Sequence, residues 1–443
     1  MSQPSLANAL LAAVGLALAG SAAAQTTPYS LKPNKPYAGA TVRVLAEKAP
    51  QFTGIRLRDK EFTDLTGIKV EWISVPFRAL QEKVAAVGAS ADSTIDVVNY
   101  LDSWGPAYAN WLMPLDDRLK RDGISMDRYP PAFAKSATFD GNVYGLPLRA
   151  HPQLLFYRKD LFEKAGLKAP STWAEAVVAG KKIQEQNSGV SGMSCMYGAD
   201  GSRQNLFVWL NFLWGAGADL FDAKSKPAWT SPAALTATRE YVELHSKHGL
   251  CQPGAVSAVE QDARVAFQQG KTAMVPMWWR FYGAIGNPKE SQLKPEQVAF
   301  VAMPAYKAGN APVTYAISLP FSISTHSKQK DAAWEFMKWL SNPVLEKRNA
   351  IERSVAGTPI SNNVVTHKAN LVDPEINAAN GNIQYAAAIS LKESNVMPQM
   401  VSWPEVGDLL SSAINKAAAG GDVNAVMQDA ATSAQRVLRR AAR

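Results

Sequence analysis

The stretch GNVYGLPLRAHPQLLFYRKDLFEKAG, residues 141–166, passes from a turn to a strand to a helix and contains one break. Asp140, Gly141 and Asn142 are strong turn residues, because glycine adopts positive φ at no steric cost and Asp and Asn side chains bond nearby backbone. Residues 154–157 form an unbroken apolar run, as expected of a strand covered on both faces. The pattern predicts that the chain crosses between two lobes here.

Between the turn and the apolar run, polar side chains recur at every second residue. In an extended chain Arg149, His151 and Gln153 point to one side. Pro152 has no N–H and removes one ladder hydrogen bond, which suits a strand that leaves one sheet before it joins another. We therefore expect the three polar side chains to face a ligand, although an ordinary buried strand with a polar rim has the same pattern.

The size and composition indicate a globular protein of two lobes. A chain of 443 residues is longer than the chains that usually fold around a single hydrophobic core. Its content of 47% hydrophobic and 19% charged residues is typical of soluble proteins. The net charge of +8 could indicate an anionic partner, but Lys and Arg occur only singly or in pairs such as Arg439-Arg440. The spread of charge therefore favours solubility, and no nucleic-acid partner is expected.

The N-terminus has the pattern of an export signal. Residues 10–19 form an apolar core, and Ala22, Ala23 and Ala24 after it fit the small-x-small cleavage rule. We predict a signal peptide over residues 1–24, cleaved near Ala24, although its first residues contain no Lys or Arg. The alternative is an N-terminal membrane helix, for which the apolar run is too short.

The chain contains two cysteines, Cys195 and Cys251. In an oxidising compartment they could form one disulfide, and two buried thiols are the equal alternative.

The first hundred residues alternate strand and helix. Residues 41–46, 68–75 and 95–100 have strand patterns, and 55–65 and 79–87 have helix patterns. This order predicts an α/β fold with a mostly parallel sheet, whose ligands gather beyond the carboxyl ends of the strands. Side chains at or just past those ends are candidate ligand-binding residues, although a solvated loop explains each of them singly: Glu47, Arg78, Asn99, Asp102 and Trp104.

Catalytic signatures are missing from the sequence. It contains no G-x-S-x-G, no G-x-x-x-x-G-K-[ST] phosphate loop, no H-E-x-x-H and no G-x-G-x-x-G motif, and only five histidines, so we expect no catalytic residue, cofactor or metal. It contains twelve tryptophans and thirteen tyrosines, several of them beside Arg, Asn or Asp at strand ends. Flat rings with neighbouring polar groups suit a sugar or polyol, although most large aromatic residues fill the core.

Four segments together resemble a known family. They are GNVYGLPLRAHPQLLFYRKDLFEKAGLKAPSTWAEAV (141–177), AFQQGKTAMVPMWW (266–279), DAAWEFMKWLSNPVLEKR (331–348) and GTPISNN (357–363). In this order they resemble the extracellular solute-binding proteins of ABC importers, specifically the carbohydrate-binding group (family 1) that includes maltose-binding protein. The resemblance covers nearly all of the chain after the signal peptide.

The resemblance implies a two-lobed periplasmic-binding-protein fold, in which each lobe is a mostly parallel sheet flanked by helices. It implies hinge strands near residues 148–150, 275–278 and 316–321. It divides the chain into a first lobe of residues 38–148 plus 279–317 and a second lobe of residues 149–278 plus 318–443. The ligand cleft lies between the lobes.

By position, the resemblance also places residues from several segments in the cleft. With the strand-end residues above, the candidate ligand-binding set is Glu47, Arg78, Asn99, Asp102, Trp104, Arg149, His151, Gln153, Trp214, Trp278, Trp279, Arg280, Arg353 and Trp403. The maltodextrin-stacking arrangement of maltose-binding protein is not recognisable, so an oligomaltoside is not implied.

The function that the resemblance implies is reversible binding of a carbohydrate or polyol in the periplasm and its delivery to ABC permease subunits in the inner membrane. The receptor would be a monomer and would perform no chemistry. One alternative is a secreted carbohydrate-active enzyme, which needs two carboxylates about 5–10 Å apart, such as Asp102 with Glu47 or Glu405. Another is the same scaffold binding a polyamine, a peptide or a metal ion.

Overall fold

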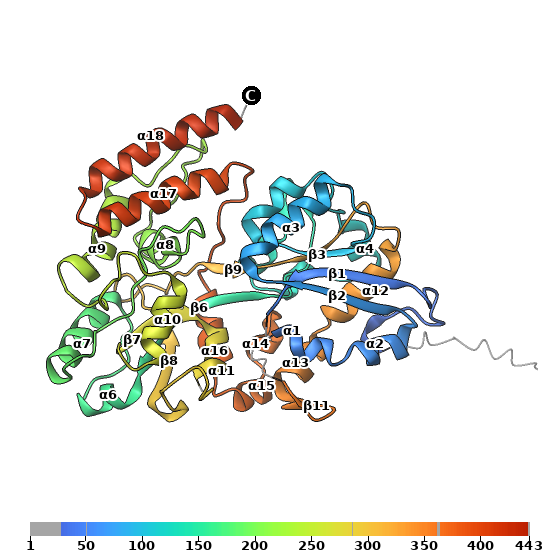
Figure 1. Cartoon of the computed structure of the whole chain (residues 1–443), viewed down its shortest axis with the longest axis horizontal. Helices are drawn as coiled ribbons and strands as arrows, with labels where there is room; N and C mark the ends of the chain where they lie inside the picture. Colours follow the sequence, from blue (N-terminus) through green and yellow to red (C-terminus); the bar gives the residue numbers. More distant parts are fainter. Residues whose placement is uncertain (1–27, 50, 286, 361–363, 442–443) are drawn as a thin grey trace, which may run out of the picture.

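The structure is a computed structural model that describes residues 28–49, 51–285, 287–360 and 364–441. Figure 1 shows two bodies side by side, each built around a sheet, with extended strands running between them. The two-lobed α/β fold is as predicted. The predicted signal peptide and residues 361–363 of the GTPISNN segment lie outside the described residues. Among the described helices, none combines the length and apolar character of a membrane span.

The first sheet is mostly parallel, as predicted. Its order is β10-β3-β1-β2, with β1 parallel to β2 and β3, and β10 antiparallel to β3. Helices on both sides cover it, including α2, α3 and α12. Its strands are β1 (Thr41–Glu47), β2 (Lys69–Val75), β3 (Val97–Asn99) and β10 (Phe321–Ile323).

The second sheet is centred on β6, which contains the polar stretch around Pro152. Its ladder order is β7-β6-β8, and β9 pairs with the start of β6. The ladders that β6 forms with β7, β8 and β9 are antiparallel, so the expectation of a mostly parallel sheet is wrong for this lobe. Parallel pairing in this lobe is limited, among the described residues, to isolated bridges such as Ser191–Thr272. The strands are β6 (Ala150–Arg158), β7 (Met274–Trp278), β8 (Val298–Ala302) and β9 (Ala316–Ser318).

Strand β6 changes partners where the sequence predicted a break. Residues 150–152 pair with β9, and from Gln153 onward the strand pairs with β7 and then also with β8. Pro152 is the last residue paired with β9. A residue without an N–H at this position lets the strand pass from one ladder to the next.

Two of the three predicted crossings are in place, and the third is wrong. Near residues 148–150 the chain passes from Leu146, which bridges Phe321 of the first sheet, into β6. Near residues 318–321 it passes from β9 to β10 of the first sheet, and Leu319 N donates to Arg149 O at 2.7 Å. In contrast, β7, which contains Pro276, is followed by β8 of the same sheet. Arg158 N donates to Ala273 O, and hydrogen-bonded pairs alternate with non-hydrogen-bonded pairs along an antiparallel ladder. The pair of Pro276 with Leu155 is therefore a non-hydrogen-bonded one, in which the nitrogen of Pro276 points away from β6. The missing N–H of Pro276 thus removes no hydrogen bond between β7 and β6.

The predicted division of the chain is also wrong for two segments. Residues 298–302 are β8, hydrogen-bonded to β6 in the second sheet, whereas residues 321–323 are β10 of the first sheet. The chain returns to the second sheet through α13 to α16, and α16 packs against β6 and β8. The two C-terminal helices, α17 and α18, then pack against α8 and α9 (Figure 1).

Local signals set the ends of several helices. Thr172 accepts a hydrogen bond from Glu175 N at the start of α7, as the T-x-x-E pattern predicts, and Pro232 occupies the first turn of α9. The helices of the first half are α1 (Gln51–Arg56), α2 (Asp59–Thr66), α3 (Phe77–Ala89), α4 (Asp116–Arg121), α5 (Pro131–Ser136), α6 (Lys159–Lys164), α7 (Trp173–Gln186) and α8 (Asn205–Gly215). Those of the second half are α9 (Pro232–Ser246), α10 (Glu260–Gln268), α11 (Tyr282–Ile285), α12 (Lys330–Leu340), α13 (Pro343–Ile351), α14 (Lys368–Leu371), α15 (Pro374–Ala379), α16 (Ile383–Leu391), α17 (Trp403–Ala418) and α18 (Val423–Ala441).

Short elements complete the described chain. The Asp140-Gly141 turn joins a hairpin of β4 (Thr138–Phe139) and β5 (Asn142–Val143), with φ of 49° and 78° at the two turn residues. A second hairpin pairs β11 (Ser354–Val355) with β12 (Thr358–Pro359). Short 3₁₀ helices are η1 (Pro28–Ser30), η2 (Asp102–Tyr108), η3 (Met126–Arg128), η4 (Trp279–Phe281) and η5 (Pro295–Gln297).

Cys195 and Cys251 form a disulfide within the second lobe. Their Cα atoms are 5.4 Å apart, and the residues are separated by 56 positions in the sequence. The side-chain amide of Gln252 bonds both main-chain groups of Cys195, at 2.8 and 2.7 Å. Of the two alternatives left open by the sequence, the structure has the bridge.

Candidate ligand-binding site

A cleft of about 720 Å³ lies between the two sheets, and both crossing strands reach it. Its volume is in the range of small-molecule sites. One wall comes from the ends of β1 and the starts of α3 and η2, and the other comes from α8, α10 and the end of β7. The lining residues are Glu47, Phe77, Gln81, Leu101, Trp104, Arg149, His151, Asp200, Gly201, Ser202, Arg203, Gln204, Phe207, Val259, Glu260, Gln261, Trp278, Arg280 and Ile317.

Six of the predicted residues line this cleft: Glu47, Trp104, Arg149, His151, Trp278 and Arg280. Arg78 lies in the first turn of α3, next to the lining residue Phe77, but its side chain is outside the described part of the structure.

Arg149 and Glu47 form a buried ion pair at the cleft wall. Nη2 of Arg149 lies 2.9 Å from Oε2 of Glu47, and the two side chains are 4% and 9% exposed. Burial lowers the pKa of Arg149 to about 10, while the Glu47 carboxylate acts in the opposite direction, so the guanidinium stays charged at neutral pH. Its Nε and Nη1 are buried and have no hydrogen-bond partner among the described residues.

His151 is held in one neutral form by Trp279. The indole Nε1–H of Trp279 donates to Nδ1 of His151 at 2.9 Å. Because an indole nitrogen is only ever a donor, Nδ1 must be the acceptor and the ring proton of neutral His151 sits on Nε2. Burial, with the neighbouring Arg149 and Arg280, holds the pKa of His151 well below its usual range, so the ring stays neutral. Trp279 is fully buried and supports the cleft from behind rather than lining it.

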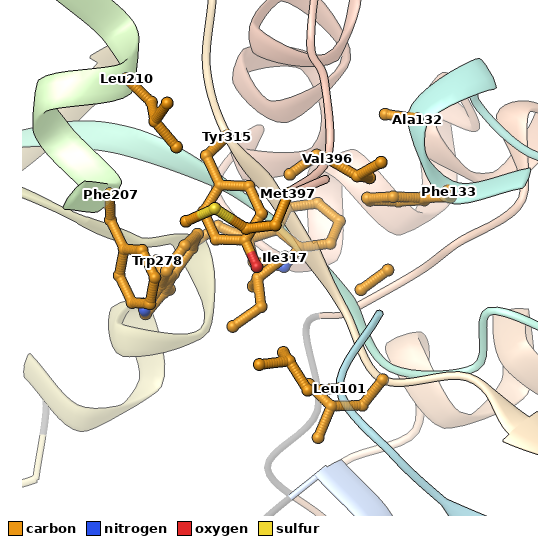
Figure 2. Packing of buried hydrophobic residues seen from close by; sticks show 14 of the residues in the cluster. Leu101, Ala132, Phe133, Phe207, Leu210, Trp278, Tyr315, Ile317, Val396 and Met397 are labelled. Atoms are coloured by element: carbon orange, nitrogen blue, oxygen red, sulfur yellow. The ribbon is translucent and has the colours of Figure 1, made fainter. Parts of the chain in front are cut away.

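Three aromatic rings pack at the wall formed by the second lobe. The ring centres of Phe207 and Trp278 are 5.3 Å apart, and Tyr315 lies 5.1 Å from Phe207 and 5.8 Å from Trp278. Figure 2 shows these rings together with Leu101 and Ile317. On the first lobe, Phe77 stacks on Trp104 at 5.9 Å. Both walls of the cleft therefore offer aromatic surface.

Asp102 is buried under the crossing segment instead of lining the cleft. Its carboxylate accepts from Ser103 N at 2.7 Å, from the Tyr315 hydroxyl at 3.3 Å and from the main-chain N–H of Ser318. Burial outweighs these bonds and raises its pKa to about 7. Asp102 therefore ties η2 of the first lobe to β9.

This raised pKa predicts a pH dependence of stability. The ordinary pKa of Asp102 is 3.8 and the folded value is about 7, so the native state binds more protons between these values. Its contribution to stability is full below pH 3.8 and is lost as the pH rises through about 7. We expect urea unfolding from pH 4 to 9 to show this loss in the wild type but not in Asp102→Asn.

The difference between the two pH profiles isolates Asp102 from other carboxyls, such as Asp59, whose pKa burial also raises to about 7. Parallel profiles for wild type and Asp102→Asn would contradict the assignment.

The other predicted residues lie away from the cleft surface, for identifiable reasons. Gln153 is buried and accepts a hydrogen bond from Asn211 at 2.9 Å. Asn99 is also buried, and its side-chain amide donates to Leu319 O at 2.8 Å. Both residues therefore support the site from behind. Trp214 donates to Asp219 at 3.2 Å near the end of α8, and Arg353 bonds Asn380 and the carbonyl of Ala379. Trp403 is buried against Phe221, at the start of α17.

The sequence did not identify the contribution of residues 200–204. Gly201 and Arg203 have φ of 81° and 60°, and Ser202 N donates to Asp200 Oδ1 at 3.0 Å, so this segment is a tight turn. The D-G-S pattern was a turn signal, but nothing local indicated that the turn lies at the cleft. For the same reason, the sequence analysis did not identify the other lining residues, which are Phe77, Gln81, Leu101, Phe207, Ile317 and residues 259–261.

The carboxylates named for an enzymatic alternative do not form a catalytic pair. Glu47 is ion-paired with Arg149, Asp102 is fully buried and does not line the cleft, and Glu405 is paired with Arg440. Glycoside hydrolysis needs two carboxylates facing one bond. The structure offers no support for that reaction at these residues.

Comparison with known proteins identifies relatives. The family described as bacterial extracellular solute-binding protein matches residues 32–345. A binding protein of Brucella abortus (strain 2308) is 26% identical over 84% of this chain and 87% of its own length. The mannitol-binding protein of Pseudomonas aeruginosa is 25% identical over 66% of each chain. A solute-binding protein of an ABC transporter from Agrobacterium vitis S4, solved with bound D-mannitol, superposes with a TM-score of 0.72 at 25% identity, covering 91% of this chain and 99% of that one.

Proposed function

Because the chain belongs to the bacterial extracellular solute-binding proteins, we propose that it is the receptor of an ABC importer for a carbohydrate or polyol, which it binds in the cleft between its lobes. The observation that carries this proposal is a cleft of about 720 Å³ that combines aromatic walls with buried hydrogen-bonding groups. The mannitol-binding relatives favour a small polyol or monosaccharide over an oligosaccharide.

The buried donors indicate how such a ligand would be held. Nε and Nη1 of Arg149 and Nε1 of Trp104 lie at the cleft wall and have no hydrogen-bond partner among the described residues. An unpaired buried donor costs about 1–3 kcal/mol. Hydroxyl oxygens of a polyol would satisfy these donors, and its C–H faces would lie against Trp278 and the Phe77–Trp104 pair. The ligand-binding residues are thus Glu47, Trp104, Arg149, His151, Trp278 and Arg280, with Phe77, Arg203, Phe207 and Glu260 added.

Membership of an extracellular solute-binding family supports a location outside the cytoplasm. We propose export by the N-terminal signal peptide, cleavage near Ala24, and residence in the periplasm as a monomer that hands its ligand to the permease subunits. No group of the cleft is assigned a catalytic role.

Binding without chemical change is the prediction that tests this function. We expect titration calorimetry with D-mannitol, ribitol, D-sorbitol and a panel of monosaccharides to show one-site binding of at least one of them. The tryptophan fluorescence should change in parallel, because Trp104 and Trp278 line the cleft. Chromatography should recover the bound compound intact. A product released at enzymatic rates, or no binding across the panel, would contradict the proposal.

A further inference from the structure

Every arginine that lines the cleft is already paired with a carboxylate of the protein. Arg149 pairs with Glu47 at 2.9 Å, Arg203 with Asp408 at 2.8 Å, and Arg280 with Glu260 at 3.5 Å. Glu47 and Glu260 also line the cleft. The guanidinium groups therefore act as neutralised hydrogen-bonding groups rather than as free positive charges.

The corner around Glu260 has the features of an anion-binding site. Oε2 of Glu260 accepts from the indole Nε1–H of Trp278 at 2.7 Å, and its Oε1 faces Nη2 of Arg280. Glu260 is also the first residue of α10, a helix whose positive end points to the cleft, since Val259, Glu260 and Gln261 all line it. An indole N–H, a guanidinium and a helix N-terminus thus surround one carboxylate.

The protein's own side chains use two main-chain donors of this helix end. The main-chain N–H of Glu260 donates to Oε1 of Gln204 at 3.1 Å, and that of Val259 donates to Oδ2 of Asp262 at 3.0 Å. The side chain of Glu260 is only 13% exposed, so its charge is poorly screened by water. A phosphate or carboxylate entering this corner would have to displace the Glu260 carboxylate and would be repelled by it.

We propose that Glu260 is the specificity-determining residue of the cleft: its carboxylate occupies the position of an anionic ligand group, so the cleft accepts uncharged polyhydroxy compounds and rejects their phosphate esters and acids. This inference rests on the proposed function for the class of ligand. It adds the charge that the ligand must have and the residue that sets it. A hydroxyl can both donate to Glu260 and accept from Arg280, whereas a fully ionised carboxylate or phosphate group can only accept.

The test uses Glu260→Ala, with Asp262→Asn as the matched control. Both variants remove one negative charge from the first turn of α10, but Asp262 does not line the cleft. Glu260→Gln is the second variant, which keeps the size of the side chain if the alanine variant folds poorly. Thermal melting checks the fold of each protein. The probes are D-mannitol, D-mannitol 1-phosphate and inorganic phosphate, titrated by calorimetry at one low ionic strength.

We expect the wild type and Asp262→Asn to show no binding of either phosphate compound at millimolar concentration. Folded Glu260→Ala or Glu260→Gln should bind D-mannitol 1-phosphate or inorganic phosphate at least about tenfold more tightly than the wild type does, since one charge-assisted hydrogen bond contributes about that factor. Wild-type binding of the phosphate ester as tightly as of mannitol would overturn the inference. So would folded Glu260 variants without the gain, or an equal gain in Asp262→Asn.

The two proposals fail in distinguishable ways. If no uncharged compound of the panel binds the wild type, the proposed ligand class is wrong, whereas a gain of phosphate binding in the Glu260 variants would still support the role of Glu260. If mannitol or a related polyol binds the wild type but the variants gain nothing, the function stands and the role of Glu260 is wrong.

Discussion

Replacement of Arg149 by alanine is expected to abolish measurable ligand binding and to lower the free energy of unfolding by about 3–5 kcal/mol, the cost of breaking a buried ion pair from one side. The alanine variant leaves the Glu47 carboxylate, whose side chain is 9% exposed, without its charge partner. It also removes the buried Nε and Nη1 donors of a residue that lines the cleft. Urea unfolding and calorimetry with the best ligand of the panel measure the two effects.

A double variant separates stability from binding. In Arg149→Met with Glu47→Gln no unpaired charge remains, so we expect most of the lost stability to return while binding stays lost, because the guanidinium donors are still absent. If Arg149→Ala unfolds at the same urea concentration as the wild type, the ion pair contributes little to stability. If this variant binds the ligand as tightly as the wild type does, Arg149 is not a ligand-binding residue.

Converting both Cys195 and Cys251 to serine is expected to lower the free energy of unfolding by about 4 kcal/mol. The bridge closes a loop of 56 residues, and the loss of loop-closure entropy in the unfolded chain gives about this magnitude. Cys195→Ser alone should cost nearly as much, because either change removes the same cross-link. Reduction of the wild type with dithiothreitol should give a matching shift in urea unfolding.

Because the disulfide lies away from the cleft lining, the folded double-serine variant should bind its ligand with wild-type affinity at 25 °C. Unfolding curves that coincide for oxidised and reduced protein would show that the bridge does not stabilise the fold.

Local patterns predicted much of the fold, and what they missed depends on distant partners. The periodicity of apolar residues indicated the strands and helices of the first lobe, and Pro152 indicated a change of ladder. The resemblance misplaced a crossing at residues 275–278, and Pro276 in that segment does not mark one, because the effect of a missing N–H depends on which neighbour the nitrogen faces. The pairing of residues 298–302 with β6 is likewise a long-range contact that no local pattern specifies.

The candidate site was predictable to a similar extent. Period-two alternation identified the side on which Arg149 and His151 lie, and strand ends indicated Glu47 and Trp104. Gln153 shares that alternation but lies where β6 has entered the second sheet, so it is covered by α8. The sequence could not show that Glu47, 102 residues before Arg149, neutralises it.

The position of β10 has a consequence for how the protein matures. This strand completes the first sheet beside β3, and the neighbouring contact between Asn99 and the carbonyl of Leu319 joins residues 220 positions apart. During synthesis the N-terminal half therefore lacks an edge of its own sheet until nearly three quarters of the chain has emerged. Long-range closure of this kind slows folding. For the export proposed above, this delay would leave the first lobe incompletely paired until the later segments arrive.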